Sequence, residues 1–194
     1  MKDSRTILKE VFRKSIHLCS SLIPFFLAAF YWYTIFGLIA VVILYYFCEL
    51  ARLEGHPVPL ISLITETAAR QRDEYKFVLG PVTLVFGILL AALMLPLPCA
   101  RVGIFALAFG DGLASLAGKL FGRIKIPFTG GKTLEGSLTC FTAVFISTYI
   151  ISRQPLVSLL VAFVTMIIEM LPLGDWDNLI IPLATGSLYM LLAA

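Results

Sequence analysis

Residues 78–97 read VLGPVTLVFGILLAALMLPL, a continuous apolar stretch without a charged side chain. A helix needs about 20 such residues to cross the hydrocarbon core of a bilayer. The whole chain agrees with this stretch, because 59% of its 194 residues are hydrophobic and only 14% are charged, against about 25% charged residues in soluble domains. The composition excludes a cytosolic globular enzyme, a disordered tail and a nucleic-acid-binding protein.

Further apolar runs lie on both sides of this stretch, so the sequence predicts an all-α, polytopic integral membrane protein with about seven transmembrane helices. The segments between the runs are too short to build a separate hydrophobic core. We therefore expect residues 1–194 to form a single membrane-embedded domain. The expected spans are Ile16–Tyr33, Thr34–Leu50, Val78–Leu97, Ala100–Gly118, Leu134–Ile151, Pro155–Leu171 and Leu179–Ala193.

The basic residues predict the orientation of these spans. With seven spans, all of the 15 Lys and Arg residues except Arg101 and Arg153 fall on the side of the N-terminus. Cytoplasmic loops carry an excess of Lys and Arg, so the N-terminus is predicted to be cytoplasmic. No Asp or Glu falls in an outer loop. We therefore expect the polar chemistry at the cytoplasmic face.

Three polar segments are expected on that face. Residues 1–15 form an interfacial helix, residues 51–77 form a cytoplasmic loop with an interfacial helix over Ile61–Lys76, and residues 119–133 form a short cytoplasmic loop. Amphipathic helices of this kind lie in the plane of the membrane surface.

Asp111 is a carboxylate inside an expected span, which costs about 2.5–3.5 kcal/mol on insertion scales. Asp111, Ser115 and Lys119 follow one another at intervals of four residues, so they share one helix face. Asp111 then lies about 12 Å deeper than Lys119. This face is expected to line a hydrated cavity, with Asp111 as a metal ligand or a base. The alternative is a buried hydrogen bond between helices.

Gly130-Gly131-Lys132-Thr133 resembles the end of a P-loop, but Ile126 stands where a Walker A motif needs Gly. No Walker A motif is therefore present. The exposed amides of the two glycines, a helix that begins near Thr133 and the charge of Lys132 still favour an anion. The alternative is a flexible turn in which Thr133 caps the helix.

Near the other end of the chain, Asp175, Asp177 and Asn178 place two carboxylates and an amide within four residues, shortly after Glu169. Mg²⁺ prefers such oxygen ligands together with substrate phosphates. The alternative is a solvated turn that caps the last helix.

Two weaker groups lie where spans meet the membrane edge. The first is Arg13, Lys14 and His17, and the second is Glu49 and Arg52. Basic residues at this position are commonly anchors at the membrane interface. Together with the glycines and carboxylates, these residues are typical of sites for phosphoryl or nucleotidyl transfer. Such reactions depend on positioning and charge neutralisation. One substrate would be anionic and soluble, and the other would arrive from the bilayer.

Short motifs in a fixed order resemble the polyprenol kinase family, which includes dolichol kinases, phytol kinases and a CTP-dependent diacylglycerol kinase. The motifs are Arg13-Lys14-x-x-His17, Glu49-x-x-Arg52, Gly110-Asp111-x-x-Ala114, Gly118-x-x-x-Gly122, Gly131-Lys132-Thr133-x-Glu135-Gly136 and Asp177-Asn178-x-x-Ile181-Pro182. The chain is also distantly similar to phosphatidate cytidylyltransferases, but no histidine follows His56, so their later His-containing segment is absent.

The resemblance implies a membrane-embedded catalytic domain that transfers the γ-phosphate of CTP to the hydroxyl of a membrane lipid alcohol, with Mg²⁺ as cofactor. The alcohol would be a polyprenol, a phytol-like isoprenoid or diacylglycerol. It also implies a cell inner membrane or its equivalent, with the site facing the cytoplasm and no nucleic acid as partner. A cytidylyltransferase that forms a CDP-lipid and a small transporter stay open as alternatives.

The resemblance also distributes roles over these residues. The nucleotide-binding residues would be Arg13, Lys14, Lys119, Arg123, Gly130, Gly131, Lys132 and Thr133. The metal ligands would be Asp111, Glu135, Asp177 and Asn178, and the catalytic residues would be Asp111, Glu169 and His17. Glu49, Arg52 and Ser115 would support the site.

Overall fold

The computed structural model describes residues 4–68 and 76–193, which form helices joined by short loops. The first half contains α1 (Ser4–Cys19), a 3₁₀ turn η1 (Ser20–Leu22), α2 (Ile23–Ala29), α3 (Tyr31–Leu53), α4 (Pro59–Ala68) and α5 (Gly80–Met94). The second half contains α6 (Leu97–Phe105), a π-helical segment η3 (Ala106–Asp111), α7 (Gly112–Leu120), α8 (Leu134–Ser152), α9 (Pro155–Met170) and α10 (Asp177–Ala193). The all-α, polytopic membrane fold that the sequence predicts is confirmed.

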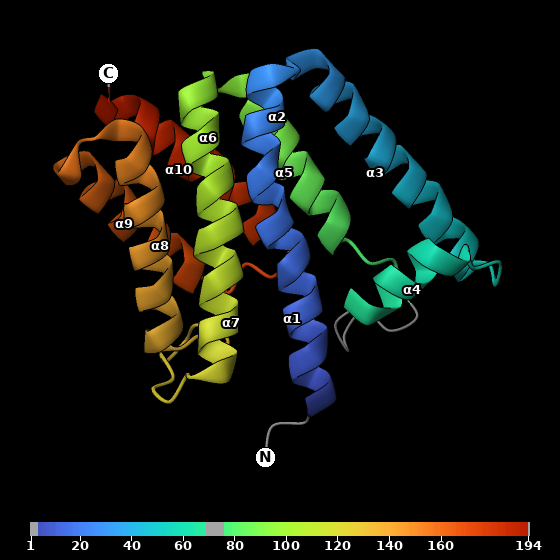
Figure 1. Ribbon diagram of the computed structural model, residues 1–194. Coiled ribbons are helices and arrows are strands. Elements are labelled where there is room, and N and C mark those ends of the chain that lie inside the picture. The colour runs from blue at the N-terminus through green and yellow to red at the C-terminus, as the bar shows by residue number, and fades with distance from the viewer. Residues whose placement is uncertain (1–3, 69–75, 194) are drawn as a thin grey trace.

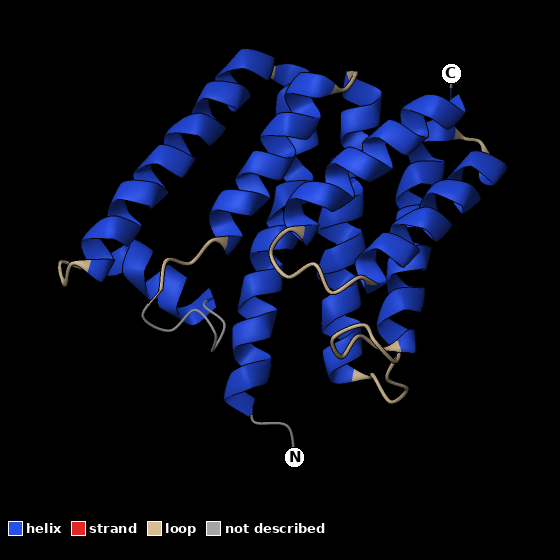
Figure 2. Ribbon diagram, turned by 180° about the vertical axis from the view of Figure 1, so that it is seen from behind, coloured by secondary structure: helices blue, strands red, loops and turns tan. Residues whose placement is uncertain are grey.

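The helices run back and forth between two ends of the bundle. The start of α1, helix α4 and the loop between α7 and α8 lie at one end, while the α5–α6 connection and the C-terminus lie at the other (Figure 1). From behind, the α7–α8 loop projects from the end that holds the N-terminus (Figure 2). The α7–α8 loop at this end contains Arg123, Lys125 and Lys132, and the orientation of the bundle in the membrane stays a prediction.

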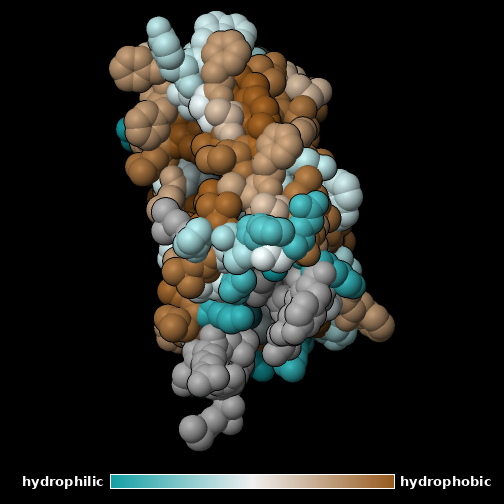
Figure 3. All heavy atoms as spheres, turned by 90° about the vertical axis from the view of Figure 1, so that its right-hand side faces the viewer, coloured by the Kyte–Doolittle hydropathy of each residue, from teal (hydrophilic) through white to brown (hydrophobic). Residues whose placement is uncertain are grey.

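Four helical segments in the described ranges are long and apolar enough to cross a membrane: Leu8–Ala29, Tyr31–Leu53, Leu97–Leu120 and Leu134–Ser152. The apolar helices α5, α9 and α10 are shorter. The count of seven spans therefore stays a prediction. Large apolar side chains stay exposed along α3, among them Phe36, Leu44 and Phe47. On the side that Figure 3 shows, apolar residues cover the upper part and hydrophilic residues gather toward the lower part, as a lipid-facing bundle requires.

The structure corrects several expected boundaries. The first and second spans separate at Phe30, whose non-helical backbone (φ −142°, ψ 60°) ends α2, rather than between Tyr33 and Thr34. The segment expected as a separate interfacial helix is the beginning of α1, which continues past Lys14 to Cys19. The other interfacial helix begins at Pro59, before Ile61, and residues 69–75 of its expected range lie outside the described residues.

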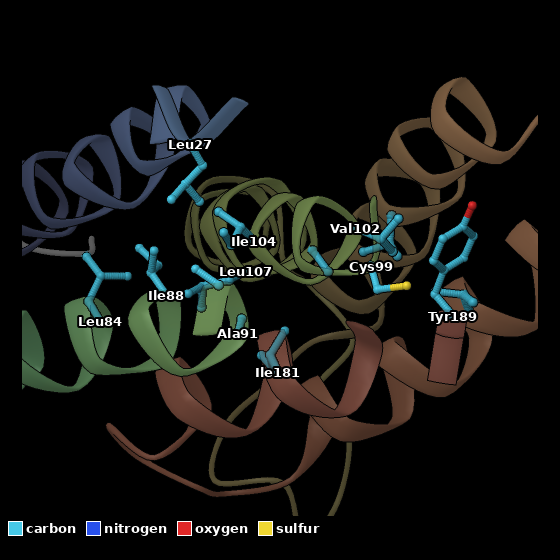
Figure 4. Close-up of a cluster of buried hydrophobic side chains, with 14 of the residues drawn as sticks. Leu27, Leu84, Ile88, Ala91, Cys99, Val102, Ile104, Leu107, Ile181 and Tyr189 are labelled. Carbon is cyan, nitrogen blue, oxygen red and sulfur yellow. The ribbon is translucent and has the colours of Figure 1, made fainter. Parts of the chain in front are cut away.

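The centre of the bundle is the α6–η3 helix, which α2, α5, α8 and α10 surround (Figure 4). Ile104, Leu107 and Ile181 are fully buried there. Apart from Arg101 and Asp111 this helix carries no charged side chain, which fits its place inside the bundle. Gly103 allows α10 to approach closely, because a Cβ atom at this position would lie only 2.1 Å from the carbonyl oxygen of Pro182.

We expect Gly103→Ala to lower the free energy of unfolding in detergent by about 1–3 kcal/mol, since a new methyl group must push α6 and α10 apart. Gly37→Ala is the matched control, because a Cβ atom at Gly37 on α3 meets no atom within 4 Å. Equal unfolding midpoints for the two variants would contradict the close α6–α10 packing.

Candidate active site

A cavity of about 570 Å³ opens where α1, α7, α8, the α7–α8 loop and the α9–α10 connection meet. Its volume falls in the range of small-molecule sites. Cationic side chains outnumber carboxylates around it. The cations are Arg13, Lys14, Lys119, Lys125 and Lys132, and the carboxylates are Glu10, Glu169 and Asp177. The excess of positive charge suits an anionic ligand.

Ion pairs between α1 and α7 build one wall of the cavity. Lys14 Nζ donates to Asp111 Oδ2, and Lys119 Nζ donates to Glu10 Oε2. Arg13 binds the other oxygen of Glu10 at 2.6 Å. His17 Nδ1 lies 3.3 Å from Asp111 Oδ2. The predicted face of Asp111, Ser115 and Lys119 therefore turns toward α1, with Ser115 and Lys119 lining the cavity and Asp111 buried behind Lys14.

The α7–α8 loop has a defined hairpin shape. The N–H of Ile126 donates to the carbonyl of Lys132 at 2.9 Å, and Gly130 and Gly131 adopt positive φ angles of 69° and 99° at the turn. Glu135, in the first turn of α8, accepts from the backbone N–H groups of Arg123 (2.9 Å) and Ile124 (3.3 Å). These contacts fix the path of the loop and present Gly130, Gly131 and Lys132 to the cavity.

Thr133 caps α8 and packs between glycines. Its hydroxyl accepts from the N–H of Gly136 at 3.2 Å. A Cβ atom at Gly118 would lie 2.9 Å from Thr133 Oγ1, and one at Gly122 would lie 2.7 Å from Thr133 Cγ2. The glycines thus let α7 and α8 close around this side chain. The helix cap that the sequence left as the alternative is what the structure shows for Thr133.

Lys132 lies among carboxylates from different elements. Its ammonium group donates to Glu169 Oε1. Burial lowers the pKa of Lys132, but the charges of Glu169, Asp111 and Asp177 outweigh burial and raise this pKa above its usual value. Lys132 therefore contacts Glu169 from α9, and the charges of Asp111 in η3 and Asp177 in α10 also act on it.

Other expected site residues hold the fold together instead of lining the cavity. Glu49 binds Arg52 through both carboxylate oxygens and accepts from the N–H of Val78 at 2.9 Å. Arg52 also donates to the carbonyl of Lys76 at 3.0 Å. This pair ties the inner end of α3 to the start of α5.

Three more expected ligands point elsewhere. The amide of Asn178 donates to Thr83 Oγ1 at 2.9 Å and to the carbonyl of Gly80 at 3.3 Å. Arg123 is exposed, and Glu135 binds the loop backbone. None of these three side chains lines the cavity, and His17 reaches the site through Asp111.

The sequence reasoning missed Glu10 and Ser137, which both line the cavity. Glu10 could have been found, because it lies four residues before Lys14 and shares its helix face. Ser137 follows Thr133 by four residues on α8, so it also shares a face with the motif that drew attention.

The oxygen atoms around the cavity fit Mg²⁺ only if a ligand supplies further donors. Within the described residues, no group of three or more His, Cys, Asp or Glu side chains forms a ready-made metal centre. Mg²⁺ in phosphate-binding sites needs only one or two carboxylates, with phosphates and waters as further ligands. Glu169 Oε2 is buried without a hydrogen-bond partner, although Glu169 lines the cavity. An oxygen in this state fits a cation that arrives with a phosphorylated ligand.

We expect Lys14→Met to lower the free energy of unfolding by about 3–5 kcal/mol, because it leaves Asp111 as a buried charge without its main partner. The double variant Lys14→Met/Asp111→Asn should recover most of this loss, since no unpaired charge remains. Denaturant unfolding in detergent micelles measures both values. A double variant as unstable as the single one would contradict the importance of this ion pair.

The chain is similar to proteins named phytol kinase and dolichol kinase. The chain is 27% identical over 142 residues to "Phytol kinase 1, chloroplastic" of Arabidopsis thaliana, which covers 64% of this chain and 47% of that protein. It is 26% identical over 217 residues to "Probable phytol kinase, chloroplastic" of Triticum aestivum, covering 99% of this chain and 70% of the relative. It is 29% identical over 160 residues to "Dolichol kinase" of Mus musculus, covering 66% of this chain and 27% of the relative.

The chain spans about half the length of the first phytol kinases that it matches. Neither a protein-family profile nor a solved structure matches it. The resemblance to the polyprenol kinase family that the ordered motifs indicate is nevertheless confirmed, because the curated proteins similar to this chain are phytol kinases and dolichol kinases.

Proposed function

We propose that this protein is a CTP-dependent lipid kinase that transfers the γ-phosphate of CTP to the hydroxyl of a membrane lipid alcohol. The observation that carries the proposal is the cationic cavity at the end of a membrane bundle, where Lys132 lies among Glu169, Asp111 and Asp177. The relatives named phytol kinase and dolichol kinase support the reaction class. The choice of CTP rests on the resemblance to the family.

The cations around the cavity would bind the triphosphate. Lys119 from α7 and Lys132 from the α7–α8 loop both line it, together with Gly130 and Gly131, which directly precede Lys132. Lys14 and Arg13 line the cavity from α1. Lys119 and Lys132 would each exchange the carboxylate partner for a phosphate oxygen, whereas Lys14 stays paired with Asp111. Stabilising the charge of the transferred phosphoryl group is the main demand of this reaction on the protein.

The lipid hydroxyl would react at the membrane side of the cavity. Its oxygen attacks the γ-phosphorus, the bond from this phosphorus to the bridging oxygen breaks, and CDP leaves. The hydroxyl proton passes to a carboxylate, for which we propose Asp111. Its Oδ2 accepts from Lys14 and lies 3.3 Å from His17 Nδ1, whereas its Oδ1 is buried without a hydrogen-bond partner. Asp111 also lies inside the Leu97–Leu120 span, where a lipid substrate arrives.

Glu169 and Asp177 would hold Mg²⁺, which supplies neutralisation of the phosphate charge when bound. Both residues line the cavity at the same end of the bundle as the basic loops. We place this end in the cytoplasm of a cell inner membrane or its equivalent, since Lys and Arg concentrate in cytoplasmic loops. A polyprenol, a phytol-like isoprenoid or diacylglycerol would be the acceptor.

Labelled nucleotide tests the reaction class. Purified protein in lipid nanodiscs is incubated with Mg²⁺, a panel of lipid alcohols and CTP labelled either at the γ-phosphate or in the cytidine. We expect the γ-label alone to enter the lipid, and CTP to exceed ATP as donor. Transfer of the cytidine label with release of pyrophosphate would instead show a cytidylyltransferase, and transfer of neither label would contradict both enzymes.

Lys132→Gln should raise the KM for CTP at least tenfold, about 1.4 kcal/mol of binding free energy, because the loop loses its charge toward the phosphates. Lys9→Ala is the matched control, since Lys9 is an exposed lysine on α1 that does not line the cavity. Steady-state kinetics at saturating alcohol measure both. An unchanged KM in the Lys132 variant would remove the loop from the nucleotide site.

A further inference from the structure

Two polar atoms without hydrogen-bond partners lie on the α8–α9 wall of the cavity. They are Ser137 Oγ and Glu169 Oε2. The Ser137 residue is 1% exposed and Glu169 is 2% exposed, yet both line the cavity. Burying a polar atom without a partner costs free energy, and such atoms are uncommon in folded proteins. These two atoms are therefore candidates for direct contact with a ligand.

Ser137 differs from three other hydroxyl groups on the same helix, and unlike Thr148, whose buried hydroxyl also has no hydrogen-bond partner, it lines the cavity. Thr139 donates to the carbonyl of Glu135 at 2.7 Å, Thr142 donates to that of Leu138 at 2.9 Å, and Ser147 donates to that of Val144 at 3.2 Å. Such bonds to the preceding turn are the usual way for a helical Ser or Thr to satisfy its hydroxyl. Ser137 does not form such a hydrogen bond, so its hydroxyl group can bind a ligand in the cavity.

The position of Ser137 suggests what this ligand is. In P-loop proteins the hydroxyl that follows Gly-Lys binds Mg²⁺. Here the equivalent hydroxyl, that of Thr133, caps α8 and is wedged between the backbones of Gly118 and Gly122. Ser137 lies one helical turn further along the same face of α8. Ser137 therefore supplies a hydroxyl group to the cavity, whereas the hydroxyl of Thr133 is used to cap α8.

We infer that Ser137 Oγ, Glu169 Oε2 and the Asp177 carboxylate form a binding site for a divalent cation of the Mg²⁺ class. All three residues line the cavity, from α8, α9 and α10. Two carboxylates and a hydroxyl are hard oxygen ligands, which favour Mg²⁺ or Mn²⁺. Phosphate oxygens and waters complete the six ligands of such an ion. The phosphate part of this site rests on the proposed function.

Lys132 and the cation would share Glu169. Lys132 Nζ occupies Oε1, and Oε2 stays without a partner. When Lys132 turns to a phosphate, Glu169 loses a positive neighbour, and the cation at Oε2 replaces it. The nucleotide and the cation therefore strengthen each other's binding, and this coupling must be the same in both directions.

Binding of Mn²⁺ tests the site without any need for turnover. Electron paramagnetic resonance of purified protein in nanodiscs measures the Mn²⁺ affinity, alone and with a non-hydrolysable CTP analogue. We expect Ser137→Ala and Glu169→Gln each to weaken Mn²⁺ binding at least tenfold in the presence of the analogue. Ser147→Ala is the matched control, because it removes a buried hydroxyl from α8 away from the cavity. Thermal unfolding checks that each variant is folded.

The outcomes separate the site from the proposed function. If the wild-type protein transfers the γ-label to lipid but both variants bind Mn²⁺ as it does, the cation site is wrong and the kinase stands. If both variants lose Mn²⁺ binding but no nucleotide donates a phosphate to any alcohol, the site stands and the kinase is wrong. Wild-type protein that binds no Mn²⁺ with or without the analogue overturns the site.

Discussion

Charged side chains inside a membrane bundle must find partners inside the bundle, and this constraint fixes how α1 lies against α7. Lys14 pairs with Asp111, and Glu10 pairs with Lys119, so the charges of α1 meet opposite charges along the neighbouring helix. Turning α1 by one residue would rotate its charged face by about 100° and break both pairs. Arg13 and Lys14 line the cavity because these pairs set the rotation of the helix.

A second constraint acts on the other side of α7, where small residues allow α7 and α8 to meet. Thr133 fills the space between Gly118 and Gly122 and also caps α8. Glu135 accepts a hydrogen bond from the backbone of the preceding loop and so fixes the direction in which the hairpin extends from α8. The result is that Lys132 reaches Glu169 on α9, although the two residues are far apart in sequence.

Much of this arrangement could be predicted from the sequence. The length of each apolar run indicates which segments cross the membrane, and the basic loops indicate which segments lie at the same end of the bundle. Asp111, Lys132 and Asp177 were all expected in the site, and the charges of Asp111 and Asp177 act on Lys132 in the structure. The break at Phe30 was not predictable, since the residues on both sides are equally apolar.

The partners of individual polar groups also depend on details that the sequence does not show. Glu135 was expected to bind a metal, but the path of the loop offers it two backbone N–H groups. Asn178 was expected to do the same, but the approach of α5 gives its amide Thr83 as a partner. A short motif identifies polar residues near a site, whereas the packing of neighbouring helices decides which of them face the ligand.

Two carboxylates at the cavity, Glu10 and Glu169, differ in how many positive charges surround them. Glu10 contacts two cations, Arg13 and Lys119, one at each oxygen. It therefore keeps a positive neighbour when Lys119 turns to a phosphate. Glu169 has Lys132 at one oxygen and no hydrogen-bond partner at the other. Once a phosphate draws Lys132 away, a buried carboxylate would stand next to an anion, and this arrangement is unfavourable without a new positive charge. The same binding event that uses the lysine thus creates the need for a cation at Glu169.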